Sequence, residues 1–128
     1  MHTSDGFRVL MVDDNLDITS VMQRGLPALG IEVTAFNDSE EAIANYKPRY
    51  YDAIILDVRM PKMTGFQVAR SIWKQDPSAN ICFFTAFEIY KPEAERIFPS
   101  LKTYCFVKKP LTPAELASHI RSHFIQAK

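Results

Sequence analysis

The sequence has no excess of charge of either sign, because fifteen basic residues balance fifteen acidic residues. A neutral chain has no overall attraction for nucleic acid or for a membrane surface, so we expect it to bind neither directly. Apolar runs long enough to cross a bilayer are also absent, and the first residues lack the basic and apolar regions of a secretory signal. Together these absences favour a cytoplasmic location.

Cysteine is scarce too, since Cys82 and Cys105 are the only two in the chain. Each lies within a short apolar run, where a free cysteine usually packs as a small hydrophobic residue. We therefore predict two buried, reduced thiols. His119 and His123 have a spacing that some metal sites use, but no further ligand is apparent near them in the sequence, which favours a solvated helix face.

Internal repeats, low-complexity tracts and linkers are absent, so nothing divides the sequence into parts. Its 128 residues suit one domain, and a hydrophobic content of 47% is enough to form an ordinary core. We expect one domain over residues 1–128.

Short apolar runs recur along the chain and predict strands. Three runs are almost continuously apolar, as expected for strands buried on both faces, whereas residues 31–36 alternate and suit an edge strand. The predicted strands are Phe7–Val12, Ile31–Phe36, Ala53–Leu56, Ile81–Thr85 and Thr103–Val107.

Helical patterns lie between these runs. Pro27 should end the first helix near Leu26, because a proline inside a helix removes a backbone hydrogen bond. Thr112, Pro113 and Glu115 form the clearest start signal, with Thr112 as the cap. The predicted helical segments are residues 15–29, 38–46, 64–75, 93–98 and 112–124.

Strands that alternate with helices predict a parallel sheet covered by helices on both faces. In such a sheet the functional site lies beyond the carboxyl ends of the strands. Those ends carry Asp13, Asp14, Asp57, Thr85 and Lys109. Three carboxylates, a hydroxyl and an ammonium group should therefore meet at one edge of the sheet.

Three clustered carboxylates repel one another and need a cation. Their oxygen atoms suit Mg²⁺, which takes one or two direct carboxylate ligands and keeps several waters. A carboxylate can also act as a nucleophile and form an aspartyl phosphate. A lysine can then pair with a phosphoryl oxygen, and a threonine hydroxyl can donate a hydrogen bond to another.

The order and spacing of these motifs resemble the receiver domain of two-component response regulators, from about Phe7 to Phe124. The resemblance implies an α/β, flavodoxin-like, doubly wound fold with five parallel strands in the order 2-1-3-4-5 and helices on both faces. The motifs that carry it are Asp13-Asp14, Leu56-Asp57-Val58-Arg59-Met60-Pro61-Lys62-Met63-Thr64-Gly65, Thr85-Ala86 and Lys109-Pro110.

The same resemblance implies a role for each acidic residue. Asp57 is the expected phosphoacceptor and also a metal ligand. Asp14 is expected to bind the metal directly, Asp13 to hold metal-bound water, and the backbone carbonyl of Arg59 to supply a further ligand. The expected ion is Mg²⁺, with Mn²⁺ as an alternative.

Further roles fall on the last two strands. By the resemblance, Thr85 should contact the phosphoryl group and Lys109 should form an ion pair with it. Lys109 is preferred to Lys108 because it directly precedes Pro110, and strand alternation agrees. Phe106, three residues before Lys109, matches the aromatic residue that changes orientation in the family. Thr85 and Phe106 are thus the expected switch residues.

The implied function is a phosphorelay switch. A sensor histidine kinase or a histidine phosphotransfer protein donates a phosphoryl group, and the receiver catalyses its transfer to its own Asp57 and its slow loss. Phosphorylation then changes a surface that binds a partner protein. The resemblance identifies neither the kinase nor the output partner, and it leaves open whether the chain acts alone or within a longer protein.

Two features depart from the common family pattern. Arg59 occupies a variable position that affects the lifetime of the phosphoryl group, so we expect its side chain to tune that lifetime. The Gly-Ala pair that commonly precedes the fifth strand is absent, and Pro92 interrupts residues 87–102, so the usual shape of this segment is not predicted.

Other interpretations remain open. Asp13-Asp14-Asn15 could cap a helix, and Asp57 could be a turn residue. The chain could also be an interaction module with a receiver fold that phosphorylation does not control. A flavodoxin would need a phosphate-binding loop of small residues after the first strand, and the familiar aspartyl-phosphate phosphatases carry a second aspartate where Arg59 stands.

Overall fold

The computed structural model describes residues 6–85 and 105–125. The strands are β1 (Phe7–Val12), β2 (Ile31–Phe36), β3 (Ala53–Asp57), β4 (Ile81–Thr85) and β5 (Cys105–Lys108). The helices are α1 (Leu16–Gly25), α2 (Ser39–Ala44), α3 (Gly65–Gln75) and α5 (Pro113–Ile120), with a 3-10 turn at Pro27–Leu29 and a π-helical turn at Arg121–Ile125. The predicted helix at 93–98 and the start of the predicted strand at 103–107 lie outside the described residues.

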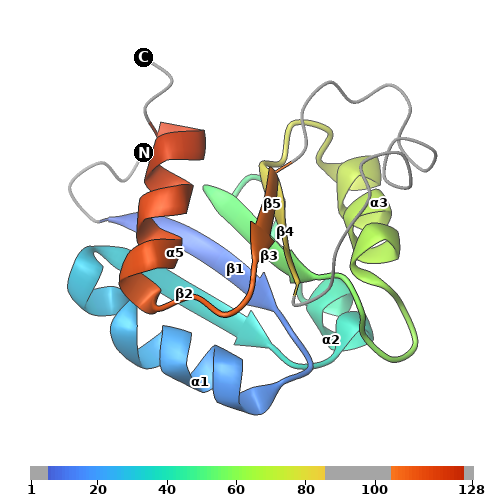
Figure 1. Cartoon of the computed structure of the whole chain (residues 1–128). Coiled ribbons are helices and arrows are strands. Elements are labelled where there is room, and N and C mark those ends of the chain that lie inside the picture. The colour runs from blue at the N-terminus through green and yellow to red at the C-terminus, as the bar shows by residue number, and fades with distance from the viewer. Residues whose placement is uncertain (1–5, 86–104, 126–128) are drawn as a thin grey trace.

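The five strands form one parallel sheet in the order β2-β1-β3-β4-β5 (Figure 1), which confirms the expected fold and strand order. The pairing of β1 with β2 runs from Phe7 and Ile31 to Val12 and Phe36. As its alternating pattern predicted, β2 lies at an edge and is mostly half-buried, whereas β3 and β4 are buried throughout.

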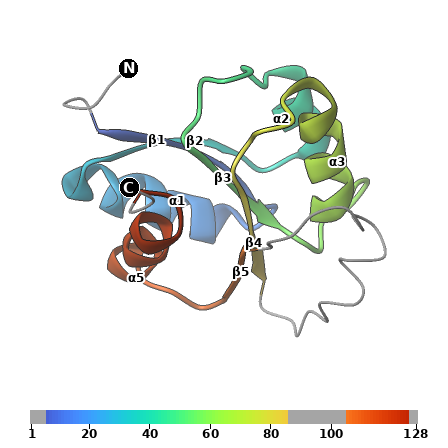
Figure 2. The same cartoon turned by 90° about the horizontal axis from the view of Figure 1, so that it is seen from above.

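Helices cover both faces of the sheet (Figure 2). Because side chains alternate along a strand, the sheet separates two apolar clusters. Leu56 and Phe83 belong to the cluster that contains residues of α2 and α3. Ile55 and Phe84 belong to the cluster that contains residues of α1 and α5. The central strands β3 and β4 therefore carry core side chains on both faces.

Local sequence sets where the helices begin and end. The side chain of Asn15 caps α1, and this helix ends before Pro27, as predicted. At the start of α5, Thr112 and Glu115 form the predicted capping box. None of the helices in residues 6–85 and 105–125 combines the length and the apolar character that crossing a bilayer requires.

A disulfide bond joins Cys82 of β4 to Cys105 of β5, so the prediction of two reduced thiols is wrong. Their predicted burial is confirmed, at 2% and 7% exposed. The two residues are register partners on neighbouring strands, with Cα atoms 4.4 Å apart, so their side chains leave the sheet side by side. The two apolar runs indicated burial but not this pairing, because register depends on how distant segments align.

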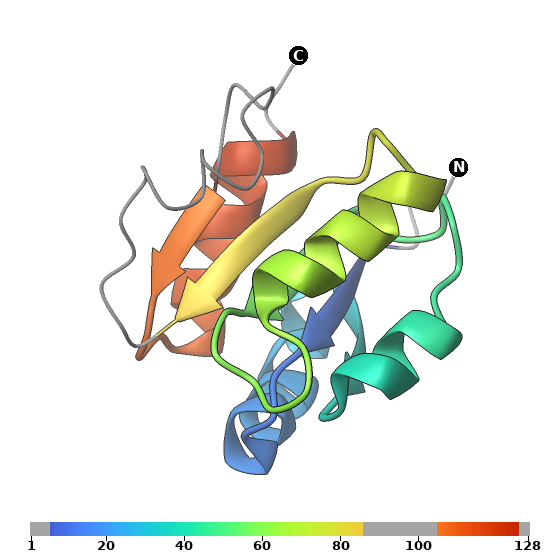
Figure 3. The ribbon, with the colours of Figure 1, turned by 90° about the vertical axis from the view of Figure 1, so that its right-hand side faces the viewer.

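The parallel arrangement brings the carboxyl ends of the strands to one end of the sheet. In Figure 3 the arrowheads of β4 and β5, in yellow and orange, point towards the same end as that of β1 in blue. The connections from β1 to α1, from β3 to α3 and from β5 to α5 begin there. This end of the sheet is where the predicted site residues should meet.

Candidate functional site

Three carboxylates converge at the carboxyl end of the sheet. Asp13 and Asp14 follow β1, and Asp57 is the last residue of β3, which pairs with β1. One oxygen atom from each side chain lies within 4.8 Å of the other two. Asp13 and Asp57 are buried, whereas Asp14 is exposed, so the cluster is open to solvent on the side of Asp14.

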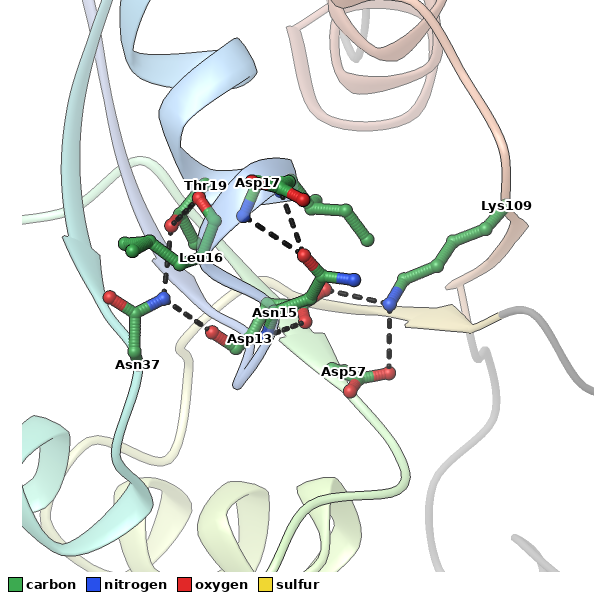
Figure 4. A network of polar contacts seen from close by, with 9 residues as sticks. Asp13, Asn15, Leu16, Asp17, Thr19, Asn37, Asp57 and Lys109 are labelled. Atoms are coloured by element: carbon green, nitrogen blue, oxygen red, sulfur yellow. Dashed lines mark hydrogen bonds and ion pairs between the residues drawn. The ribbon is translucent and has the colours of Figure 1, made fainter.

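A lysine that follows the edge strand β5 lies against this cluster (Figure 4). The ammonium nitrogen Nζ of Lys109 is 2.8 Å from Asp13 Oδ2 and 3.3 Å from Asp57 Oδ1. The backbone N–H of Lys109 donates to the carbonyl of Thr85 at 2.8 Å, which holds the residue next to the end of β4. Its neighbour Lys108 is exposed. Of the two candidate lysines, it is Lys109 that contacts the carboxylates.

The surroundings of Asp57 disfavour its negative charge. Burial, followed by repulsion from Asp13, raises the pKa of Asp57 from 3.8 to about 6, although attraction to Lys109 opposes this change. One lysine is therefore not enough to offset burial and two neighbouring carboxylates. A carboxyl group with so perturbed a pKa, in a cluster at the end of a sheet, is typical of a functional site.

The two oxygens of the Asp13 carboxylate have different partners. Its Oδ1 accepts from the backbone N–H of Asn15 at 2.9 Å. Its Oδ2 is buried and has no hydrogen-bond donor among the described residues apart from the ammonium group of Lys109, with which it forms the ion pair. A buried acceptor in this state, beside two further carboxylates, suits a hard cation with oxygen ligands. The acidic cluster therefore fits Mg²⁺.

Thr85 and Phe106 lie on the neighbouring strands β4 and β5. Thr85 is the last residue of β4 and is 3% exposed. Phe106 is half-buried in β5, and its ring stacks on that of Phe83 with centroids 5.4 Å apart. Because side chains alternate along β4, Thr85 points to the same face of the sheet as Phe83. The Thr85 side chain and the Phe106 ring therefore lie on the same face of the sheet, which α3 covers.

Arg59 lies in the loop that leaves β3, two residues after Asp57, and its side chain is exposed. The loop then returns to the end of β3, where α3 begins at Gly65 with a hydrogen bond from its N–H to the carbonyl of Val58 at 2.8 Å. A Cβ atom at Gly65 would collide with the carbonyl oxygen of Asp57, so this close approach requires glycine.

Sequence reasoning assigned no role to two residues that support the site. Gly65 was visible as a glycine near the start of the predicted helical segment 64–75, and a glycine inside such a pattern can have a packing reason. Asn37 had no such signal. Its side-chain amide donates to the backbone carbonyl of Asp13 at 2.8 Å, a contact that spans 24 residues of sequence.

The chain is similar to one family of known proteins over most of its length. The family model of the response regulator receiver domain matches residues 9–121. A curated relative, the transcriptional regulatory protein PrrA of Mycobacterium leprae, is 30% identical over 115 residues, which is 90% of this chain and 48% of the relative. The chain spans about half the length of the curated relatives it matches.

Solved structures are similar over nearly the whole chain. The chemotaxis protein CheY4 of Vibrio cholerae shares 28% identity with a TM-score of 0.79, and the match covers 91% of this chain and 98% of that one. The response regulator TrrA of Thermotoga maritima shares 28% identity with a TM-score of 0.75, and the match covers 91% and 97% of the two chains.

Proposed function

The chain belongs to the response regulator receiver domain family, and from this premise we propose that Asp57 accepts a phosphoryl group in a Mg²⁺-dependent reaction. The observation that carries the proposal is the position of Lys109, which contacts Asp13 and Asp57 within a cluster of three carboxylates. One place then holds a nucleophile, a cation to receive the phosphoryl oxygens, and ligands for a metal.

Transfer needs an ionised nucleophile and a charge partner for the incoming group. A carboxylate oxygen of Asp57 attacks the phosphorus of a phosphohistidine, the P–N bond breaks, and the imidazole leaves with the electron pair of that bond. Lys109 pairs with Asp57 before transfer and can pair with a phosphoryl oxygen afterwards. The movement required is short, because the ammonium group already lies against the carboxylate.

We propose that Asp14, Asp57 and the backbone carbonyl of Arg59 hold Mg²⁺ directly and that Asp13 binds it through water, with Mn²⁺ as a substitute ion. When bound, the ion supplies positive charge that offsets the phosphoryl oxygens. The convergence of the three carboxylates, with one oxygen of each within 4.8 Å of the other two, supports this arrangement. The structure of TrrA was solved in complex with Mg²⁺ and beryllofluoride, which supports the choice of ion.

We propose that Thr85 and Phe106 convert phosphorylation into a change of surface. A phosphoryl oxygen on Asp57 would draw the Thr85 hydroxyl towards it, which would open space for the Phe106 ring. Such a switch works only if the phosphorylated form stabilises one of two states more than the other. The burial of Thr85 and the half-burial of Phe106 support the assignment, since both side chains have defined surroundings.

We propose a sensor histidine kinase or a histidine phosphotransfer protein as donor, because TrrA was solved with the histidine kinase ThkA. The donor must bring its phosphohistidine to Asp57.

We propose that the donor docks in an apolar groove beside Lys109. This groove has a volume of about 210 Å³ and lies between α1 and the loop before α5, and Val21 at its side is 42% exposed. In Val21→Glu, transfer from a kinase should slow while phosphorylation by acetyl phosphate is unchanged. Ala44→Glu, an exposed site on α2, is the control.

Residues 1–128 are proposed to form one receiver domain that acts in the cytoplasm on a partner protein. The formal net charge of zero supports the absence of direct binding to nucleic acid or to a membrane by this domain. The curated relatives are about twice as long, so activities of their remaining residues are not assigned to this chain.

The alternative is a receiver fold that binds partners without control by phosphorylation. Incubation with acetyl phosphate, followed by intact mass measurement with and without Mg²⁺, separates the two. The proposed function predicts a gain of one phosphoryl group that requires the metal. No gain at any Mg²⁺ concentration would favour the interaction module.

A further inference from the structure

The turn between β2 and α2 contacts the loop that carries Asp13. The side-chain amide of Asn37 donates to the carbonyl of Asp13 at 2.8 Å and to the hydroxyl of Thr19 at 2.9 Å (Figure 4). Thr19 is 1% exposed, and its hydroxyl donates in turn to the carbonyl of Leu16 at 3.1 Å. One side chain thus joins the end of β2 to Asp13 and to the first turn of α1.

The backbone of Asp13 is held at both of its polar groups. Its N–H donates to the carbonyl of Phe36 at 3.1 Å, and its own carbonyl accepts from the adjacent Asn37. The last residue of β2 and the residue after it therefore fix the peptide groups on either side of the Asp13 side chain. Displacement of the Asp13 backbone would break at least one of these hydrogen bonds.

The next two residues, Asp38 of the same turn and Ser39 at the start of α2, contact the loop between β3 and α3. Ser39 is 2% exposed, and its hydroxyl donates to the carbonyl of Met63 at 3.1 Å. Asp38 pairs with the ammonium group of Lys62 at 2.9 Å. This loop also contains Arg59, whose carbonyl is a proposed metal ligand. One turn therefore contacts both loops that carry the proposed ligands.

We propose that the turn at Asn37 and Asp38, together with Ser39 at the start of α2, is a positioning element that holds the two ligand loops at the spacing a metal requires. The inference rests on the Mg²⁺ site of the proposed function and names residues that touch neither metal nor phosphoryl group. Without a cation the three carboxylates repel one another, and the loops would relax by moving apart. A turn bonded to both loops resists that movement, so less rearrangement accompanies metal binding.

Asn37 is the residue of the turn best suited to a test. Its side chain is exposed, so its removal leaves no cavity in the core. Its amide is the donor in both contacts, and alanine at this position would leave Asp13 and Thr19 without that donor. Thr19→Val is an independent second variant, since it keeps the shape of a buried side chain but removes the anchor for Asn37 without touching Asp13.

The experiment measures Mg²⁺ affinity by calorimetry in the full chain, with thermal unfolding in parallel. Asn37→Ala should weaken Mg²⁺ binding by about tenfold, at the low end for residues that orient metal ligands, and Thr19→Val should weaken it by a smaller factor. Phosphorylation by acetyl phosphate at saturating Mg²⁺ should stay within about twofold of the wild type. Asn45→Ala is the matched control, because Asn45 also donates its amide to a backbone carbonyl, that of Glu41 at 2.8 Å, but outside the site.

The outcomes distinguish failure of the positioning role from failure of the proposed function. If the wild type binds no Mg²⁺, the proposed function fails and takes this inference with it. If the wild type binds Mg²⁺ and both variants bind it equally well, the positioning role is overturned while the proposed function stands. A lowered melting temperature with unchanged Mg²⁺ affinity also overturns it, because the turn would then support only the fold.

Discussion

The ammonium nitrogen of Lys109 lies 3.3 Å from Asp57 Oδ1, although 52 residues separate the two along the chain. The contact depends on β4 lying between β3 and β5 and on the register that places Lys108 beside Thr85. Burial and Asp13 raise the pKa of Asp57 more than Lys109 lowers it. The lysine alone thus leaves the site short of positive charge, which a metal ion would supply.

The raised pKa of Asp57 predicts how the stability of the folded protein depends on pH. The pKa of Asp57 in the folded protein is about 6, above its ordinary value of 3.8, so between these values the folded state binds more protons than the unfolded state. The contribution of Asp57 to stability is therefore fully present below pH 3.8 and is lost as pH rises through 6. Urea unfolding of the metal-free protein between pH 4 and 8 measures it.

Asp57→Asn removes this contribution, since asparagine does not titrate. The unfolding free energy of the variant should exceed that of the wild type by a margin that grows from pH 4 to about pH 6 and then levels off. Asp17→Asn, at an exposed position in the first turn of α1, should follow the wild type. Parallel curves for Asp57→Asn and the wild type would show that burial does not perturb this carboxyl group.

Phe106→Ala should separate phosphorylation from its consequence. The ring stacks on Phe83 and carries no group that could bind a metal or accept a phosphoryl group, so phosphorylation by acetyl phosphate should proceed at a near-normal rate. Binding of an output partner to the phosphorylated form should be impaired, because the proposed second state needs the ring. In wild-type protein, NMR shifts induced by beryllofluoride should reach residues 87–107. Shifts confined to the carboxylate cluster would contradict the coupling.

Arg59 is expected to lengthen the lifetime of the phosphorylated state. Water attacks an aspartyl phosphate in line, opposite the Asp57 oxygen, and an exposed planar guanidinium in the loop two residues away can obstruct that path. Arg59→Ala should therefore dephosphorylate about three- to thirtyfold faster, which corresponds to roughly 0.6–2 kcal/mol of barrier.

The rate should be followed at saturating Mg²⁺ after rapid removal of the phosphodonor, with Arg70→Ala on the exposed face of α3 as control. An unchanged rate would mean that the Arg59 side chain is inert. A slower rate would mean that its charge assists hydrolysis, as an arginine finger does.

The bond between Cys82 and Cys105 should contribute to stability. It joins residues 23 apart in sequence, and closing a loop of that length in the unfolded chain is worth about 3 kcal/mol in the chain-entropy model. Reduction should lower the unfolding free energy by about that amount, while a variant with serine at both positions should not respond to reductant. Titration of two free thiols in denatured, unreduced protein would disprove the bond.

The site could be predicted from sequence because of a topological rule. Strands that alternate with helices form a parallel sheet, and Asp13, Asp57, Thr85 and Lys109 each stand at a strand end, so they had to lie at one edge. The strand order itself rested on a family resemblance, because apolar runs indicate burial but not which strands are neighbours. Pro27 ended α1 where expected, since that effect is local.

What could not be predicted depends on long-range alignment. Cys82 and Cys105 were separately identified as buried, but their bond follows from the register of β4 with β5. Asn37 is one polar residue among several in its turn, and only the packing of β2 beside β1 brings it to the carbonyl of Asp13. Neither relationship leaves a local pattern in the sequence.

The most direct test of the central claim is the intact mass of the protein after incubation with acetyl phosphate and Mg²⁺. The wild type and the control Asp17→Asn should each gain one phosphoryl group, and a chelator should abolish the gain. Asp57→Asn should gain none under the same conditions, because the nucleophilic carboxylate at the end of β3 is gone. A full gain of one phosphoryl group by Asp57→Asn would contradict the account.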